Sequence, residues 1–229
     1  MPATSTKPNR MRKTAPGDSR TLLKSRAYEQ LKSDIVEGVF APGSFLSERR
    51  LVEQLGMSKT PIRAALERLE GEGFVRVSPR QGIVVREPSL REVADQFEIR
   101  LALERHVIEA LAGNLNTGQI AELRANLQLQ REAAAREDLR ESIRLDSEFH
   151  ISLCRFHGNQ EIVATMLRLR EKMTWVIGLV FKQNDGRMVP NLREHEAIAN
   201  AIIAGDREEA VARLRSHLNY GRQSLLEPL

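Results

Sequence analysis

The 229-residue sequence has one cysteine, few aromatic residues and no long apolar run. The single cysteine, Cys154, cannot form an intramolecular disulfide, so we expect a protein of the reducing cytoplasm. The longest apolar run, Trp175 to Phe181, is far shorter than the roughly 20 residues that a membrane-spanning helix needs. The first twenty residues hold no apolar stretch typical of a secretory signal. We therefore expect neither a disulfide-stabilised secreted protein nor a membrane protein.

Positive charge is concentrated at the N-terminus of the chain. Residues 1–21 carry a net charge of +4, residues 22–88 of +2 and residues 89–229 of −2. The first of these segments is rich in proline, serine, threonine, lysine and arginine, with too few large apolar side chains to offset the entropy of ordering. We expect a disordered basic arm over 1–21, which would attract a polyanion without regard to its sequence.

The segment after this arm shows the pattern of a helix-turn-helix. Apolar residues at three-to-four spacing predict a first helix, which Pro42-Gly43 ends. Ser47 and Ser58 stand at the N-cap positions of two shorter helices. The expected helices are 22–39, 48–55 and 59–72.

A β-hairpin is expected directly after these helices. Two β-branched runs, 74–77 and 83–86, flank a turn that ends at Gly82. The three helices and the hairpin together predict a winged helix-turn-helix over 22–88.

The helix predicted over 59–72 begins with residues suited to DNA. Its first turn, Ser58-Lys59-Thr60-Pro61-Ile62-Arg63, combines a cap, a hydroxyl and two cations. A helix N-terminus offers free amides and a positive dipole end to phosphate. Lys59 and Arg63 lie four residues apart on one face, and arginine has the shape to read guanine with two hydrogen bonds. Either cation alone is typical of a solvated helix surface.

From residue 28 to residue 85 the chain resembles the winged helix-turn-helix of the GntR family of bacterial transcription regulators. The resemblance rests on the Ala41-Pro42-Gly43 turn, on Leu46-Ser47-Glu48-Arg49 and on Ser58-x-Thr60-Pro61-x-Arg63. It implies a homodimer on a palindromic operator. The family usually has arginine at position 59, so the lysine there predicts altered base readout. The DNA contacts implied by the resemblance are Arg49, Lys59, Thr60, Arg63 and Gly82.

Beyond Pro88, long helical periodicities separated by capping residues and glycines replace the strand-like runs. Ser89, Asp138 and Asp206 each precede a glutamate by three residues, and Thr117 marks a further helix start. The fold class expected is therefore mainly α, with a winged helix-turn-helix followed by a six-helix bundle over 89–229. The six helices are expected near 90–112, 118–135, 139–157, 160–182, 190–204 and 207–226.

Four residues of the second domain form a candidate metal site. Asp146 and His150 lie four residues apart on one helix face, and His195 and His217 stand on two later helices. Three imidazoles and one carboxylate suit Zn²⁺, Ni²⁺ or Mn²⁺ better than Ca²⁺ or Mg²⁺. The alternative is that each histidine is a hydrogen-bonded or exposed residue with no metal.

The second domain resembles the FCD ligand-binding domain of the FadR-type branch of the GntR family. The resemblance lies in EIRLALE at 98–104, DSEFHISLCRFHGN at 146–159, REHEAIANAI at 193–202 and GDREEAVARLRSHL at 205–218. It implies a divalent metal on the four residues just named and a small carboxylate effector near it. Six helices rather than seven resemble the VanR-like subgroup.

Arg100 stands on the first helix expected in this domain, where its guanidinium would pair with the carboxylate of the effector. A structural salt bridge is an equally good account of this residue.

The sequence thus predicts a homodimeric, cytoplasmic regulator, a repressor rather than an enzyme, which a small carboxylate releases from double-stranded DNA. Two alternatives stay open. A metal-dependent hydrolase could use the same aspartate and histidines, although Glu148 would project away from them and no other general base is evident. The metal could instead be purely structural.

Overall fold

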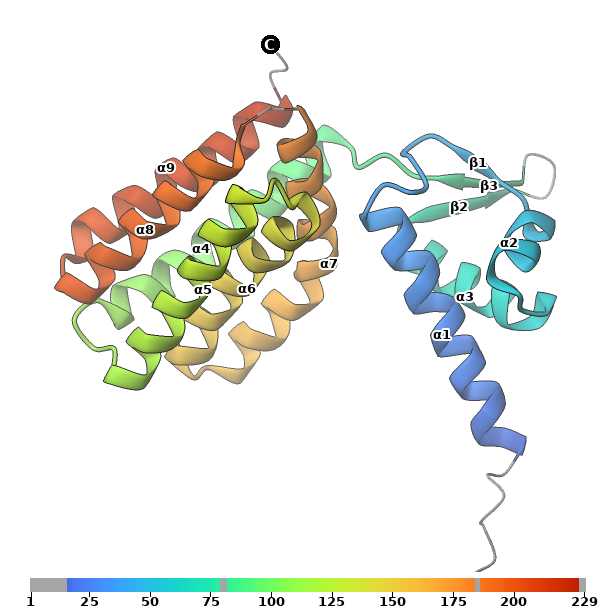
Figure 1. The fold of residues 1–229 in the computed structure, drawn as a ribbon, viewed down its shortest axis with the longest axis horizontal. Helices are drawn as coiled ribbons and strands as arrows, with labels where there is room; N and C mark the ends of the chain where they lie inside the picture. Colours follow the sequence, from blue (N-terminus) through green and yellow to red (C-terminus); the bar gives the residue numbers. More distant parts are fainter. Residues whose placement is uncertain (1–15, 79–81, 184–185, 227–229) are drawn as a thin grey trace, which may run out of the picture. The chain divides into compact units, whose positions relative to one another are not determined.

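The structure, a computed structural model, describes residues 16–78, 82–183 and 186–226. The chain divides into two compact units between Arg86 and Glu87 (Figure 1). The fold class is the one predicted, a winged helix-turn-helix followed by a bundle of helices. No helix in the described ranges is long and apolar enough to span a membrane.

The first unit consists of helices that pack beside a small antiparallel sheet. The strand order is β1-β3-β2, and Val75 pairs with Val85 between the two hairpin strands. Helix α3 packs on α1 through a buried face that includes Ile62 and Leu69. The elements are α1 (Pro16–Val36), β1 (Phe45–Leu46), α2 (Glu48–Leu55), α3 (Lys59–Gly71), β2 (Val75–Ser78) and β3 (Gly82–Val85).

Three details of this unit differ from the sequence prediction. Helix α1 begins at Pro16, so residues 16–21 of the arm expected to be disordered are helical. It ends at Val36 rather than Val39, ahead of Gly38 with its positive φ. The two-residue strand β1 was not predicted, since so short a segment has no periodicity of its own and forms by pairing with β3. Residues 1–15 of the arm and the wing turn 79–81 lie outside the described residues.

All six helices expected in the second unit are present among the described residues. Ser89 and Glu92 form the reciprocal capping box that their spacing predicts at the start of α4. The cap of α5 is Asn116 rather than Thr117, because its side chain accepts from the amide of Gln119 and the Gln119 side chain returns to the Asn116 amide. The helices are α4 (Leu90–Leu111), α5 (Thr117–Ala135), α6 (Leu139–His157), α7 (Gln160–Gln183), α8 (Met188–Ala204) and α9 (Arg207–Leu226).

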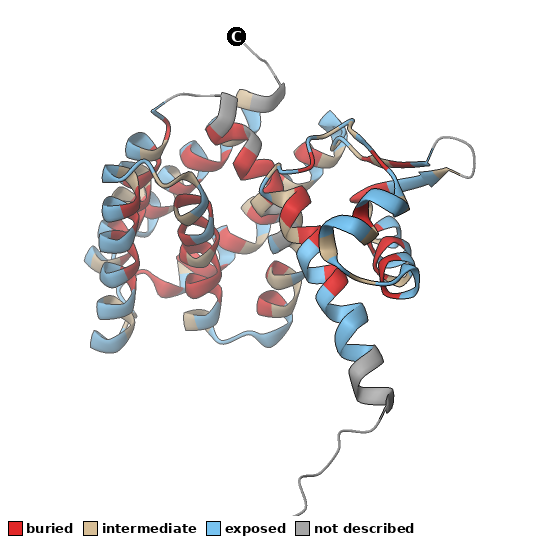
Figure 2. Ribbon diagram, turned by 45° about the vertical axis from the view of Figure 1, so that its right-hand side comes forward, coloured by how far each residue is buried: buried red, intermediate tan, exposed pale blue. Residues whose placement is uncertain are grey.

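Helix α6 lies in the centre of this bundle. It packs against α4, α5, α7 and α8, and every residue from Leu145 to Cys154 is buried except the partly exposed Glu148. Across the bundle, the buried residues lie mainly on the helix faces turned toward other helices (Figure 2). Polar residues on such a helix have no access to water, so they need partners inside the protein. The central position of α6 therefore determines where the polar site of the bundle lies.

A buried polar cluster connects the C-terminal end of helix α3 to α1. Lys32 is only 4% exposed, and its ammonium lies 2.6 Å from a carboxylate oxygen of Glu72, just beyond α3. The Tyr28 hydroxyl donates to the same carboxylate at 2.7 Å, and the Arg68 guanidinium lies 3.5 Å from the Tyr28 ring centroid. Burial would raise the pKa of Glu72, but the hydrogen bonds from Lys32 and Tyr28 outweigh burial and lower that pKa.

We predict that Glu72→Gln destabilises the protein by about 1–3 kcal/mol at neutral pH, because it leaves the buried Lys32 ammonium without its counter-charge. The native pKa of Glu72 is lowered, so its contribution is complete above the unfolded-state pKa and is lost as the pH falls. The difference between the variant and the wild type should therefore shrink in acid. Urea denaturation across this pH range measures both effects.

Glu67→Gln is the control, since Glu67 is an exposed glutamate on helix α3, five residues before Glu72. This variant should change stability by no more than about 0.5 kcal/mol. Equal destabilisation by both substitutions would contradict the role given to the buried pair.

Candidate DNA interface and metal centre

The N-terminus of α3 has no side-chain capping hydrogen bond from Ser58 in the part of the chain that the structure describes. Ser58 itself occupies the predicted N-cap position with extended backbone. At the start of α2, by contrast, the Ser47 hydroxyl accepts from the amide of Arg50. The first amides of α3 are thus left for another acceptor, such as a phosphate oxygen.

The residues expected to contact DNA are exposed. Lys59 and Thr60 lie in the first turn of α3, and the side chains of Arg49 and Arg63 are 88% and 61% exposed. Gly82 starts strand β3 with a φ of +84°, and a Cβ there would lie 3.3 Å from the Leu46 carbonyl oxygen. A side chain at the end of the wing would therefore be strained.

Sequence reasoning missed a partner of Arg63. The Arg63 Nε donates to both carboxylate oxygens of Glu48, each at 3.0 Å. This hydrogen bond and the charge of Glu48 raise the pKa of Arg63 above its usual value. The two residues are 15 positions apart, and no sequence spacing signals a contact between the first residue of α2 and the first turn of α3.

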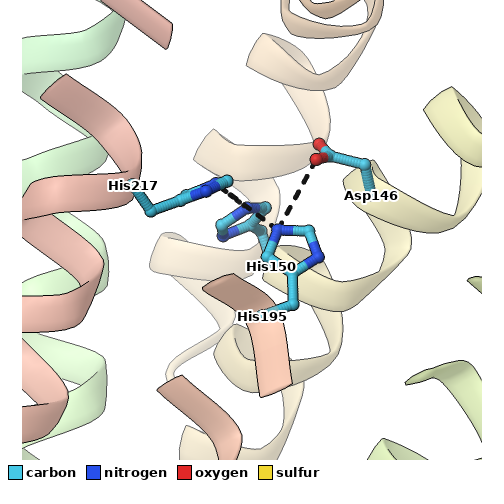
Figure 3. Close-up of side chains that lie close together, drawn as sticks. All are labelled: Asp146, His150, His195 and His217. Atoms are coloured by element: carbon cyan, nitrogen blue, oxygen red, sulfur yellow. Dashed lines mark hydrogen bonds and ion pairs between the residues drawn. The ribbon is translucent and has the colours of Figure 1, made fainter. Parts of the chain in front are cut away.

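The structure brings together the four residues of the candidate metal site (Figure 3). Asp146 and His150 come from α6, His195 from α8 and His217 from α9. One ligand atom from each can be chosen so that all four atoms lie within 4.8 Å of one another. All four residues are buried.

The three imidazoles turn the same nitrogen inward. In a neutral imidazole, an acceptor that receives a hydrogen bond from Nδ1–H fixes the proton on Nδ1. The other ring nitrogen, Nε2, then carries the free lone pair. The Nε2 atoms of His150 and His217 are 3.2 Å apart, and those of His195 and His217 are 3.4 Å apart. Lone pairs this close repel unless a cation lies between them. The Nδ1 contacts are His150 with Glu104 at 2.5 Å, His195 with Gln130 at 2.8 Å and His217 with Glu194 at 2.7 Å.

Asp146 completes the ligand set. Its Oδ1 accepts from the Asn191 amide at 2.9 Å and lies 3.5 Å from His195 Nε2. Its Oδ2 is buried without a hydrogen-bond partner among the described residues. A buried carboxylate oxygen without a partner is costly, and coordination would satisfy it. Three nitrogens and one oxygen therefore fit a divalent transition metal or zinc.

The electrostatics favour the protonation state that a metal needs. Burial lowers the pKa of His150, and burial is also the main cause that lowers the pKa of His195 well below its usual value. Both imidazoles are then neutral near pH 7, which is the form that binds a metal. Burial would raise the pKa of Glu104, but the charge of Arg100 and the hydrogen bonds from His150 and Arg100 together outweigh burial and lower that pKa to about 2.

Arg100 makes the structural salt bridge that was one of its two expected roles. Its Nε donates to Glu104 at 2.8 Å, inside the bundle. Its Nη2 is nevertheless buried and has no hydrogen-bond partner in the described part of the chain. The guanidinium lines a small pocket with Gln96, Phe97, Val176 and Ile177. The salt bridge therefore leaves one donor for a further anion.

Sequence reasoning also missed the residues that hold the ligands. Glu104 accepts from both Arg100 and His150, and Glu194 accepts from His217 while Arg187 donates to both of its oxygens. Burial would raise the pKa of Glu194, but these hydrogen bonds lower it to about 2. The i, i+4 spacing of Arg100 and Glu104 was the one available signal.

His106, His157 and Glu148 are not part of the candidate metal site and have partners elsewhere. The rings of His106 and His157 pack against each other, with centroids 5.2 Å apart. Glu148 pairs with Arg155 on a partly exposed face of α6. The metal-dependent hydrolase thus gains no general base from Glu148.

The fold and these two sites define a class of protein, in which a DNA-binding winged helix precedes an all-helical sensor domain. Residues 23–85 match the family described as bacterial regulatory proteins, gntR family, and residues 95–220 match the FCD domain. The chain therefore belongs to the GntR family of transcriptional regulators and carries a C-terminal FCD effector-binding domain. Members of this family bind DNA, usually as dimers that respond to small molecules, and they are regulators rather than enzymes.

Individual relatives agree with this assignment. An uncharacterised HTH-type transcriptional regulator in an unstable DNA locus of Streptomyces ambofaciens is 32% identical over 191 residues, 83% of this chain and 80% of the relative. The HTH-type transcriptional repressor RspR of Escherichia coli K12 is 28% identical over 204 residues, 89% of each chain.

Solved structures share the fold. A putative GntR regulator from Rhodococcus sp. RHA1 superposes with a TM-score of 0.76 at 24% identity, covering 90% of this chain and 98% of that one. McbR/YncC of E. coli superposes with a TM-score of 0.70 at 24% identity, covering 86% and 93%.

Proposed function

We propose that this regulator is a homodimeric repressor that a small carboxylate releases from a palindromic operator, and that the carboxylate binds beside a divalent metal in the second unit. The observation that carries the proposal is the cluster of three Nε2 atoms beside the Asp146 carboxylate, whose Oδ2 is buried without a hydrogen-bond partner among the described residues. The name of the relative RspR supports repression as the direction of control. The VanR-like subgroup stays a prediction.

On the DNA side, the N-terminus of α3 enters the major groove. Arg63 reads a guanine, while Lys59, Thr60 and Arg49 contact the backbone and neighbouring bases. Gly82 lets the wing approach the duplex closely, since it has no side chain. Two copies related by a two-fold axis read the two halves of a palindrome.

On the sensor side, Asp146 Oδ2 and the Nε2 atoms of His150, His195 and His217 hold Zn²⁺, Ni²⁺ or Mn²⁺. Such an ion supplies Lewis acidity and open coordination positions that suit a carboxylate oxygen. The Nη2 of Arg100 donates to the same carboxylate. Glu104 keeps this guanidinium and the His150 ring in fixed orientations.

Release requires that the carboxylate binds one dimer arrangement more tightly than the other. Helix α4 is the element suited to convey this preference. It carries Arg100 and Glu104, and it begins at Leu90, five residues after strand β3 ends at Val85. A shift of α4 toward the bound anion therefore acts on the segment that leads out of the winged helix.

For the DNA interface, we predict that Arg63→Ala weakens operator binding by about 1–3 kcal/mol and relaxes the base preference at one position of each half-site. Lys59→Ala should weaken binding to all duplexes alike and reduce the salt slope by about 1, as the loss of a phosphate contact does. Mobility-shift titrations on duplexes selected from the DNA upstream of the gene measure both. Arg105→Ala, on α4, is the control, and unchanged operator affinity in Arg63→Ala would reject the assigned role.

For the metal, we predict that Zn²⁺, Ni²⁺ or Mn²⁺ raises the melting temperature of chelator-treated protein. The ion binds the native state alone, so a free concentration of about 100 times Kd adds about 2.7 kcal/mol of stability. Asp146→Asn should lose most of this effect, because an amide oxygen is a weaker ligand than a carboxylate. His106→Ala should respond like the wild type, and an equal response in Asp146→Asn would exclude the site.

For the effector, we predict that Arg100→Lys lowers the sensitivity of DNA release to small carboxylates about tenfold, because an ammonium cannot reproduce the guanidinium fork. The rise in melting temperature caused by metal should stay unchanged. A panel of organic and sugar acids in the mobility-shift assay tests this. If chelation lowers stability but no acid releases DNA in the presence of metal, the metal is structural and the proposed sensing is wrong.

A further inference from the structure

The contact between Glu48 and Arg63 has an unusual form. A carboxylate usually meets a guanidinium through two parallel hydrogen bonds, often from Nε and one Nη. Here Nε alone faces the carboxylate, at 3.0 Å from each of its oxygens. The two Nη atoms make no hydrogen bond to any other described residue. Glu48 thus occupies the Nε edge of the guanidinium and leaves Nη1 and Nη2, at the tip of the side chain, available to another acceptor.

Glu48 is well placed to hold this orientation. It is the first residue of α2, directly after the N-cap Ser47, where the helix dipole favours a carboxylate. Its side chain is only about half as exposed as that of Arg63, at 32% against 61%. Glu48 is therefore the fixed partner and Arg63 the one that is oriented.

The tip of the Arg63 guanidinium has the geometry that base readout needs. Guanine presents O6 and N7 side by side in the major groove, and arginine pairs with them through two parallel N–H groups. With Nε engaged by Glu48, the available pair is Nη1 and Nη2, at the tip of the side chain. Without this partner, the Arg63 side chain samples many rotamers in the free protein. Binding to a base then restricts it to one rotamer, which costs conformational entropy.

We infer that Glu48 is a specificity-determining residue of the DNA interface, a positioning residue that presents the end of the Arg63 guanidinium to a guanine. The inference rests on the proposed function, since it requires that α3 reads DNA. Glu48 itself does not bind DNA. Its negative charge weakens attraction to every duplex, so it improves discrimination at the expense of general affinity.

The negative charge of Glu48 and its positioning of Arg63 affect two different quantities, which are affinity for random DNA and preference for guanine. Removing the carboxylate should raise affinity for random DNA by about twofold to fivefold, because one repulsive charge is gone. The same change should reduce the preference for guanine at the Arg63 position by about tenfold, within the range that one bidentate contact provides. A structural role for Glu48 would weaken binding to both kinds of duplex.

The test uses the full-length protein and a randomised duplex library. Selection with the wild type gives the preferred motif, and selection with Arg63→Ala identifies the position that Arg63 reads. Competition titrations at one salt concentration then compare the motif with duplexes altered only at that position, for Glu48→Ala and Glu48→Gln. Glu48→Gln keeps a neutral acceptor for Nε, so it should retain more of the preference than Glu48→Ala.

Glu53→Ala is the matched control. Glu53 lies on the same helix and is also near an arginine, but its carboxylate lies 3.9 Å from Arg49. Its removal should raise affinity for random DNA as Glu48→Ala does, and should leave the preference at the Arg63 position unchanged. Thermal melting of each variant confirms that the winged helix is intact.

The outcomes separate this inference from the proposed function. If the wild type selects no motif, the proposed DNA binding is wrong and the inference fails with it. If a motif appears but Arg63→Ala relaxes no position, the guanine contact proposed for Arg63 is wrong and the inference fails with it. If Arg63→Ala relaxes a position but Glu48→Ala keeps the full preference there, only the inference is overturned. Relaxation at the Arg63 position in Glu48→Ala and not in Glu53→Ala supports it.

Discussion

The sensor domain depends on the burial of a polar set in the centre of a helical bundle. Water cannot reach Asp146 or His150 on the central helix α6, so their polar atoms need partners from other helices. Several of them have one, from Glu104 and Asn191. The close inward Nε2 atoms and the Asp146 oxygen without a partner among the described residues are what remains, and both fit the divalent metal proposed for this site.

One carboxylate connects the metal site and the effector site that we propose for this domain. Glu104 orients the His150 ring with one oxygen and the Arg100 guanidinium with the other. Its low pKa keeps it ionised at any physiological pH, so it acts as an acceptor toward both. An anion drawn to Arg100 and a metal on His150 therefore share a support within one turn of α4, and binding of one would alter the free energy of binding the other.

The sequence predicts the local features and misses the tertiary ones. Capping patterns place the helices of the bundle to within two residues, apart from the choice of Thr117 over Asn116, where the neighbouring residue had the matching Gln119. Asp146 and His150 follow from helical spacing, whereas His195 and His217 joined them only as a candidate set, which the family resemblance then favoured over separate histidines. The residues behind the ligands lie 46, 65 and 23 positions away from them, and no periodicity encodes such pairings. The strand β1 was missed for the same reason, since only its partner β3 defines it.

The two arginine–glutamate pairs show how one interaction serves two purposes. Arg100 and Glu104 are both almost fully buried, so separating them would expose a charge to a medium that cannot solvate it. That pair is permanent and can only gain a further partner. Arg63 and Glu48 lie at the surface, where water solvates both ions and the net strength of the pair is small. Arg63 can therefore take up a second acceptor without losing the first at great cost. The burial of each pair, more than its chemistry, determines whether the pair is permanent or can be rearranged when a ligand binds.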